Sequence, residues 1–121
     1  MPVHGPGIVL SVSFALHDYE VQDLGNALRQ SGAEAIELNG HRLTARTVIG
    51  EKGGRATVDG QAIPVPYRVT AVGDPTKLTS GAEGIAASLQ PRGAVTMEQQ
   101  PDVRIAATVP ERPVIYSSFG G

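Results

Sequence analysis

The chain contains two amphipathic helical segments, and each is flanked by segments with the alternating pattern of a β-strand. In the first unit, apolar residues alternate from Ile8 to Phe14, a helix is predicted over Asp18–Ser31, and a second strand over Ala33–Leu38. In the second unit, a strand at Tyr67–Val72 precedes a helix predicted over Asp74–Gln90, and another strand follows. A period of two indicates a strand, whereas a period near 3.6 indicates a helix. Two successive β-α-β units can bury their helices against a sheet in only a few ways.

The ends and the middles of the helices carry further signals. Asp18 is predicted to be the N-cap of the first helix and Asp74 that of the second, with Pro75 at the first helical position, because these residue types suit the free N–H groups of a first turn. Gly25 lies inside the first helix, where glycine lowers helix stability by about 1 kcal/mol relative to alanine. A glycine inside a helix often marks close packing on a sheet, and such packing is expected at Gly25. Gly81 is expected to interrupt the second helix.

The region between the two units consists of short strand patterns and turns. Leu43–Ile49 is predicted to be a strand, and the glycine-rich residues 50–54 a turn. Two more short strands are expected at residues 56–58 and 62–63. An inserted β-hairpin region over residues 44–63 is therefore expected.

The two ends of the chain are also predicted to contain strands. Gly5-Pro6-Gly7 is expected to precede the first strand. Strands are predicted over Ala94–Gln99 and Val103–Ala107, joined by a turn at Gln100–Asp102, because proline and aspartate favour turns.

Together these patterns predict an α/β domain of the α+β type. The expected architecture is a ferredoxin-like antiparallel sheet with two main helices on one face and the inserted β-hairpin region, since right-handed crossovers place both helices on the same side. Residues 1–109 are expected to form this single domain, and residues 110–121 a loosely held C-terminal tail.

Composition excludes several classes of function. The formal net charge of −2 disfavours binding to nucleic acid and binding to a membrane surface through a polybasic segment, because both require a basic face. Cysteine is absent, which excludes disulfides, thiolate catalysis and cysteine metal ligands. No apolar run approaches the roughly 20 residues that span a bilayer, and the first residues lack the pattern of a signal peptide. The chain itself is therefore expected to be soluble.

No pattern of catalytic or metal-ligating residues emerges. His17 and Asp18 resemble an oriented base pair, but adjacent side chains usually point apart, and Asp18 is expected to cap a helix. His4, His17 and His41 do not have the spacing of metal ligands. Residues 50–55 lack the following helix that a phosphate-binding loop needs. The sequence predicts no enzymatic activity, no metal site and no cofactor.

The polar turn Asn39-Gly40-His41-Arg42 is the candidate for a binding site. Asn39, His41 and Arg42 are candidate partner-binding residues, with Arg42 able to reach a carboxylate on a partner. Two alternatives remain open. Asn-Gly is the usual dipeptide of a tight hairpin, and Arg42 can form a salt bridge within its own fold or lie exposed.

Several blocks of the sequence resemble one bacterial family. They occur in the family's order: Gly5–Gly7, His17–Leu28, Ser31–Leu43, Val58–Gln61 and Pro66–Pro75. The chain is similar, from about Gly5 to Ala107, to the family DUF881, also labelled UPF0749. On this resemblance residues 1–109 form a single DUF881-like domain.

The resemblance implies a location but no chemistry. Members of the family have no established enzymatic activity. They typically carry an N-terminal membrane helix, then a coiled coil, then this domain outside the membrane, and several are encoded near division or envelope genes. Neither the membrane helix nor the coiled coil occurs in this sequence, and the loop between Phe14 and His17 is shorter than the family's.

We therefore expect a non-catalytic protein-interaction or scaffold domain of a membrane-anchored bacterial protein, located at the extracytoplasmic face of the cell membrane and linked to division or envelope assembly. The alternative is a regulatory domain that binds a small molecule or nucleotide. The expected partners are an envelope or division protein and a second copy of the chain, which would form a homodimer. Val9, Val95 and Met97 are expected to supply apolar surface for that dimer. Contact with the membrane is expected only through an N-terminal anchor.

Overall fold

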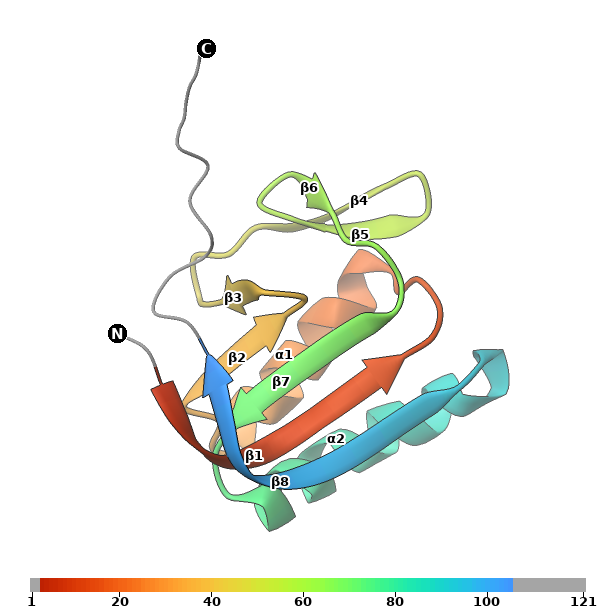
Figure 1. Ribbon diagram of the computed structural model, residues 1–121. Coiled ribbons are helices and arrows are strands. Elements are labelled where there is room, and N and C mark those ends of the chain that lie inside the picture. The colour runs from red at the N-terminus through yellow and green to blue at the C-terminus, as the bar shows by residue number, and fades with distance from the viewer. Residues whose placement is uncertain (1–2, 106–121) are drawn as a thin grey trace.

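The computed structural model describes residues 3–105 of the 121-residue chain (Figure 1). The predicted tail, residues 110–121, lies outside this range. The elements in chain order are β1 (Val3–Val12), α1 (Asp18–Gln30), β2 (Ala35–Leu38), β3 (His41–Leu43), β4 (Ile49–Lys52), β5 (Arg55–Val58), β6 (Gln61–Ala62), β7 (Tyr67–Val72), α2 (Pro75–Leu89), a 3₁₀ turn (Gln90–Arg92) and β8 (Val95–Ile105).

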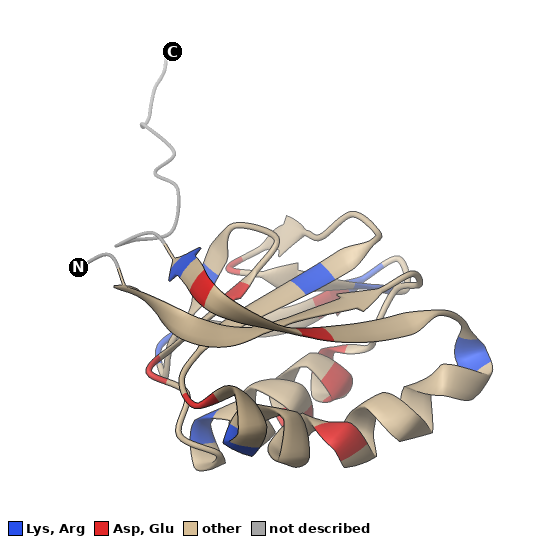
Figure 2. Ribbon diagram, turned by 60° about the horizontal axis from the view of Figure 1, so that its bottom comes forward, with Lys and Arg blue, Asp and Glu red and all other residues tan. Residues whose placement is uncertain are grey.

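The main sheet has the predicted ferredoxin-like topology. Its five strands lie in the order β3-β2-β7-β1-β8, and each neighbouring pair is antiparallel. The connections β1-α1-β2 and β7-α2-β8 place both helices on the same face of the sheet, as Figures 1 and 2 show. A separate three-stranded sheet, β4-β5-β6, lies within the inserted region. The α+β fold is thus confirmed.

The core lies between the helices and the sheet. Ile8, Leu10 and Val12 on β1 are at most 1% exposed, and they belong to one apolar cluster with side chains from both helices. Alternation along β1 directs these three side chains to the helix side. The helices contribute Val21, Leu24, Leu28, Leu78, Ala82, Ala86 and Leu89.

The start of α2 is as predicted, whereas the cap of α1 is not. Asp74 caps α2, because its Oδ1 accepts hydrogen bonds from the backbone N–H groups of Thr76 (2.9 Å) and Lys77 (3.4 Å). The N-cap of α1 is His17, not Asp18. The Glu20 carboxylate accepts a hydrogen bond from the His17 N–H at 2.8 Å, and a Glu at the third helical position stabilises such a start.

Gly81 does not interrupt α2, contrary to the prediction. The helix continues from Pro75 to Leu89 through this residue. A Cβ at Gly81 would lie 1.8 Å from Ser31 Oγ and 2.7 Å from Ser31 Cβ. The glycine therefore allows α2 to pack closely against the end of α1.

The predicted turn at Gln100–Asp102 is part of a continuous strand. β8 runs from Val95 to Ile105, and Gly5–Gly7 lies inside β1 opposite it. The register shifts by one residue between Gly5 and Gly7, which identifies a β-bulge on β8. Proline has no N–H to donate, so a bulge is where a strand tolerates it.

The predicted strand Leu43–Ile49 is two strands with a turn between them. β3 ends at Leu43 and β4 begins at Ile49. Thr47 Oγ1 donates a hydrogen bond to the Arg42 carbonyl (3.2 Å) and accepts one from the Thr44 N–H (2.7 Å). These bonds satisfy backbone groups locally, so they replace the pairing that a strand would need.

The open face of the main sheet differs from the expectation for a dimer. Val95 and Met97 belong to the helix-side core, whereas Val9 lies on the opposite face in a small second cluster. Val9 itself is only 7% exposed. The surface proposed for self-association is therefore not formed by these residues, and the homodimer stays a prediction.

Candidate functional site

Asn39, from the predicted polar turn, is used to hold the fold together. It lies between β2 and β3 with φ 47°, followed by Gly40 with φ 88°, which are the left-handed conformations of a tight hairpin turn. Its Nδ2 donates hydrogen bonds to the carbonyls of Pro64 (3.0 Å) and Pro66 (3.1 Å), and its Oδ1 accepts one from the Arg68 N–H (2.6 Å). The side chain therefore ties the turn to the segment that leads into β7.

The other two predicted residues lie on β3 and are not brought together with Asn39 in one pocket. His41 is opposite Leu38 and Arg42 is opposite Glu37, and both are half-buried. Arg42 lines a hollow of 190 Å³ together with Glu34. Asn39 instead lines a groove on the open face of the main sheet. A partner-binding role for these residues stays a prediction.

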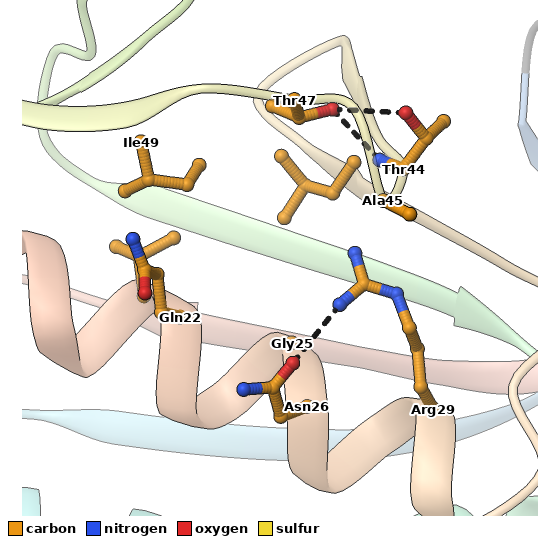
Figure 3. Close-up of a pocket in the computed structure, with 10 residues that line it drawn as sticks. Gln22, Gly25, Asn26, Arg29, Thr44, Ala45, Thr47 and Ile49 are labelled. Atoms are coloured by element: carbon orange, nitrogen blue, oxygen red, sulfur yellow. Dashed lines mark hydrogen bonds between the residues drawn. The ribbon is translucent and has the colours of Figure 1, made fainter.

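A cleft of 470 Å³ lies between α1 and the segment that connects β3 to β4 (Figure 3). We call it the α1 cleft. One side is a flank of α1, on which Val21 and Gly25 are buried and the neighbouring polar side chains are exposed. The other side is the turn at residues 44–48 with the start of β4. Its lining residues are Val21, Gln22, Gly25, Asn26, Arg29, Leu43, Thr44, Ala45, Thr47 and Ile49.

The floor of the α1 cleft is apolar and includes a glycine. Val21 and Leu43 are 3% and 7% exposed, and Ile49 packs against the same core. A Cβ at Gly25 would meet one group within 4 Å, the Arg29 guanidinium, with Nη1 at 3.7 Å. The prediction that Gly25 marks close packing on the sheet is therefore wrong. Its missing side chain instead leaves room in the cleft.

The rim of the α1 cleft carries a cation without an acid. Arg29 Nη1 donates a hydrogen bond to Asn26 Oδ1 at 3.2 Å, one helical turn earlier (Figure 3). None of the ten lining residues is acidic. Within residues 3–105, no carboxylate lies within ion-pair distance of Arg29. The guanidinium therefore retains donors for another group.

The wall opposite α1 is held in place by hydrogen bonds. Thr44 and Thr47 bond to each other across the turn, as Figure 3 shows. Beyond them, Val48 and Asp59 exchange two bonds: the Val48 N–H donates to Asp59 Oδ1 at 2.9 Å, and the Asp59 N–H donates to the Val48 carbonyl at 2.8 Å. The turn is thus fixed to the small sheet, and the cleft has two defined sides.

A second hollow lies on the open face of the main sheet. It has a volume of 320 Å³ and is lined by charges of both signs, including Glu37, Arg68, Asp102 and Arg104. Hydrogen bonding to His4, assisted by Arg104, lowers the pKa of Asp102 below its ordinary value. Figure 2 shows that acidic and basic residues are interspersed in this view of the molecule. Within this groove the Asp102 carboxylate is already paired, with Arg104 at 3.3 Å and with His4 at 3.2 Å.

The side chains of His17 and Asp18 bond to different partners and not to each other. His17 Nδ1 lies 3.1 Å from Glu51 Oε1, and Asp18 Oδ1 accepts a hydrogen bond from the Tyr19 N–H. Glu51 Oε1 also accepts a bond from the Asp18 N–H at 3.2 Å. The bond to His17 and the bond to this backbone N–H lower the pKa of Glu51. These contacts join β4 to the start of α1.

Among residues 3–105, no three His, Cys, Asp or Glu side chains gather in a way that could hold a metal ion. In the same range, neither α1 nor α2 is long and apolar enough to cross a membrane.

Sequence comparison identifies related bacterial proteins. The model of a family described as bacterial protein of unknown function (DUF881) matches residues 1–118. The UPF0749 protein YlxW of Bacillus subtilis is 41% identical over 66 residues, which are 54% of this chain and 29% of the relative. The UPF0749 protein Rv1823 of Mycobacterium tuberculosis is 40% identical over 58 residues, 48% of this chain and 19% of the relative. The chain therefore matches less than a third of each relative's length.

Structural comparison supports the fold. The crystal structure of an uncharacterized conserved protein from Mycobacterium tuberculosis superimposes with a TM-score of 0.82. The alignment covers 99% of this chain and 92% of that chain, at 24% sequence identity. This similarity concerns the fold alone.

Proposed function

Because the chain belongs to the DUF881 family, a bacterial family of unknown function, we propose that it is a non-catalytic binding domain that holds a segment of another protein in its α1 cleft. The observation that carries this proposal is the floor at Gly25. A glycine inside a helix lowers stability by about 1 kcal/mol, and no contact within the described chain requires it. Space for a ligand gives the position a role.

The shape of the surface favours an extended segment of protein chain. The α1 cleft and the neighbouring hollow of 190 Å³ share Arg29, Leu43 and Thr44 in their linings. The two hollows therefore adjoin and continue from the flank of α1 to the edge of the main sheet. An apolar floor with polar groups along its rim suits a chain that inserts an aliphatic side chain and bonds through its backbone.

A regulatory domain for small molecules is the second candidate. The volume of 470 Å³ lies within the range of ligand pockets, about 300–1,000 Å³. The amide and guanidinium groups of Gln22, Asn26 and Arg29 converge on its rim. The continuation into the neighbouring hollow favours the protein segment over a compact ligand.

The cellular setting is a proposal from the family resemblance. We propose that the domain is carried by a longer, membrane-anchored protein and faces the outside of the cell membrane, where its partner takes part in division or envelope assembly. The relatives are several times longer than the region matched, which accords with additional segments in those proteins.

Selection from a displayed library of random peptides tests the binding function. Wild-type protein is expected to enrich peptides that share an aliphatic anchor. Gly25→Leu fills the floor and is expected to abolish their binding, whereas Gly84→Leu places the same side chain where nothing lies within 4 Å on α2 and is expected to retain it. Peptides that bind wild type and Gly25→Leu equally, or a selection that enriches none, would contradict the proposal.

A further inference from the structure

We infer that the ligand of the α1 cleft carries a carboxylate directly beside an aliphatic side chain, an inference that rests on the proposed function. The first argument is charge. Arg29 is the charged residue among the ten that line the cleft, although the chain as a whole has a formal net charge of −2. Glu34 lines the adjoining hollow together with Arg29, but among residues 3–105 no carboxylate lies within ion-pair distance of this guanidinium, which can therefore attract a further anion.

The second argument is the orientation of the guanidinium. The bond from Nη1 to Asn26 Oδ1 fixes the Arg29 side chain along the rim. Guanidinium has five donors in a planar fork, so this bond leaves others for a bidentate contact with a carboxylate. Asn26 also brings its own Nδ2 donors to the same rim. Arg29 and Asn26 therefore offer several hydrogen-bond donors, and in the described part of the chain no negatively charged acceptor lies within ion-pair distance of the guanidinium.

The third argument is the distance between floor and rim. The position of a Cβ on Gly25 lies 3.7 Å from Arg29 Nη1. A ligand atom cannot occupy that position, which is one bond length from the Gly25 Cα, but a methyl or methylene group that rests on the floor above it lies close to the guanidinium. The carboxylate that binds the guanidinium must be attached close to that group, on the same residue or the next one.

The position of Arg29 in the last turn of α1 does not account for these features. The helix dipole favours any cation there. It does not require a glycine one turn earlier, nor an apolar floor beside the cation. The combination of Gly25, Leu43 and Arg29 instead matches an aliphatic group joined to an acid.

Two chemical sources supply this arrangement, and three synthetic peptides distinguish them. One source is the α-carboxylate of a chain that ends in an aliphatic residue, and the other is an Asp side chain that follows one. The first peptide is acetyl-Gly-Ser-Ala-Leu with a free carboxylate, and the second is the same peptide as its C-terminal amide. The third is acetyl-Gly-Ala-Leu-Asp-Gly amide. Each is titrated into the folded protein by isothermal calorimetry.

At least one acidic peptide is expected to bind about tenfold more tightly than the neutral amide, as a charge-assisted bidentate contact does. Arg29→Gln is expected to abolish this preference. Arg46→Gln, which makes the same charge change on the neighbouring turn outside the cleft lining, is expected to retain it. Melting curves verify that each variant is folded.

The outcomes separate the two proposals. If all three peptides bind wild type equally and none binds Gly25→Leu, the binding function stands and the carboxylate is refuted. If an acidic preference survives in Arg29→Gln, the carboxylate site is elsewhere and this inference is wrong. If no peptide binds at millimolar concentration, or if all bind Gly25→Leu as well as wild type, both proposals fail.

Discussion

Gly25 and Gly81 both lie inside amphipathic helices, but they face different surroundings. At Gly81 the helices α1 and α2 meet, and an added Cβ would lie 1.8 Å from Ser31 Oγ. At Gly25 an added Cβ would point into the α1 cleft and would approach one guanidinium at 3.7 Å. The first glycine is required by packing inside the molecule. The second is not, so it is the one that suggests a function.

The largest effect is expected for Gly81→Ala, which should lower the free energy of unfolding by about 3 kcal/mol. The new methyl group overlaps Ser31, and relief requires the two helices to separate. Urea unfolding measures the change. Adding Ser31→Gly removes both overlapping atoms and should restore most of the lost stability. A single variant as stable as wild type would show that the two helices do not meet at this residue.

Tyr67→Phe tests the wall on the cleft side and should lower the free energy of unfolding by about 2 kcal/mol. The Tyr67 hydroxyl accepts a hydrogen bond from the Ala56 N–H at 3.0 Å, and both groups are buried. Removing the hydroxyl leaves a buried donor without its partner. This bond joins β7 of the main sheet to β5 of the small sheet, so amide exchange should quicken in β4 and β5 first. If amide exchange quickened equally in β1 and β8, the bond would not stabilise the small sheet separately from the main sheet.

Gly25→Ala and Gly84→Ala sharpen the comparison because both are expected to change the free energy of unfolding by the same amount. Each should raise the free energy of unfolding by about 0.5–1 kcal/mol, because alanine is the better helix former and neither methyl group meets a clash. Thermal or urea unfolding of both variants provides the check. The two should differ in binding alone, with Gly25→Ala the weaker binder. A destabilised Gly25→Ala would mean that its surroundings resemble those of Gly81.

The smallest expected effect is on the pH dependence of unfolding, and it concerns Glu51 on β4. Hydrogen bonds from His17 and from the Asp18 N–H hold the pKa of this carboxyl below its ordinary value of 4.5. A lowered pKa in the folded state stabilises the protein above the ordinary value, and that contribution is lost as the pH falls through the lowered pKa. Unfolding followed from neutral pH to below 4.5 should therefore depend less on pH in Glu51→Gln. Identical pH profiles for both proteins would refute the contact.

The elements that depend on local pattern were predictable, whereas those that depend on distant partners were not. Alternation and capping predicted both helices, the strands β1, β2 and β7, the ferredoxin-like arrangement and the cap at Asp74. The continuity of β8 could not be predicted from local pattern. The bulge beside Pro101 lies opposite Gly5–Gly7, nearly a hundred residues earlier in the chain. The cap at His17 had a visible signal in Glu20, three residues later, although histidine is not a usual capping residue.

The candidate site was harder to predict than the fold. The Asn39 turn attracted attention because its residues are polar, yet its amide bonds to the backbone of the segment before β7. The α1 cleft combines a helix flank with a turn about twenty residues further along the chain. Its one local signal was Gly25. Sequence alone cannot tell a glycine that lines a cavity from one that packs on a neighbour, because the neighbour comes from another part of the fold.

The pairing of β1 with β8 also determines how the domain responds to mechanical force. Val3 and Ile105, the first and last described residues, lie opposite each other in an antiparallel register. A pull between these two residues therefore loads the hydrogen bonds of β1 and β8 one after another, as in a zipper, instead of all at once. Tension would open this edge of the sheet first, whereas α1 packs on the face of the sheet and not at the edge formed by β8 (Figure 1). Under such a pull, the pairing of β1 with β8 is expected to open before the α1 cleft is disturbed.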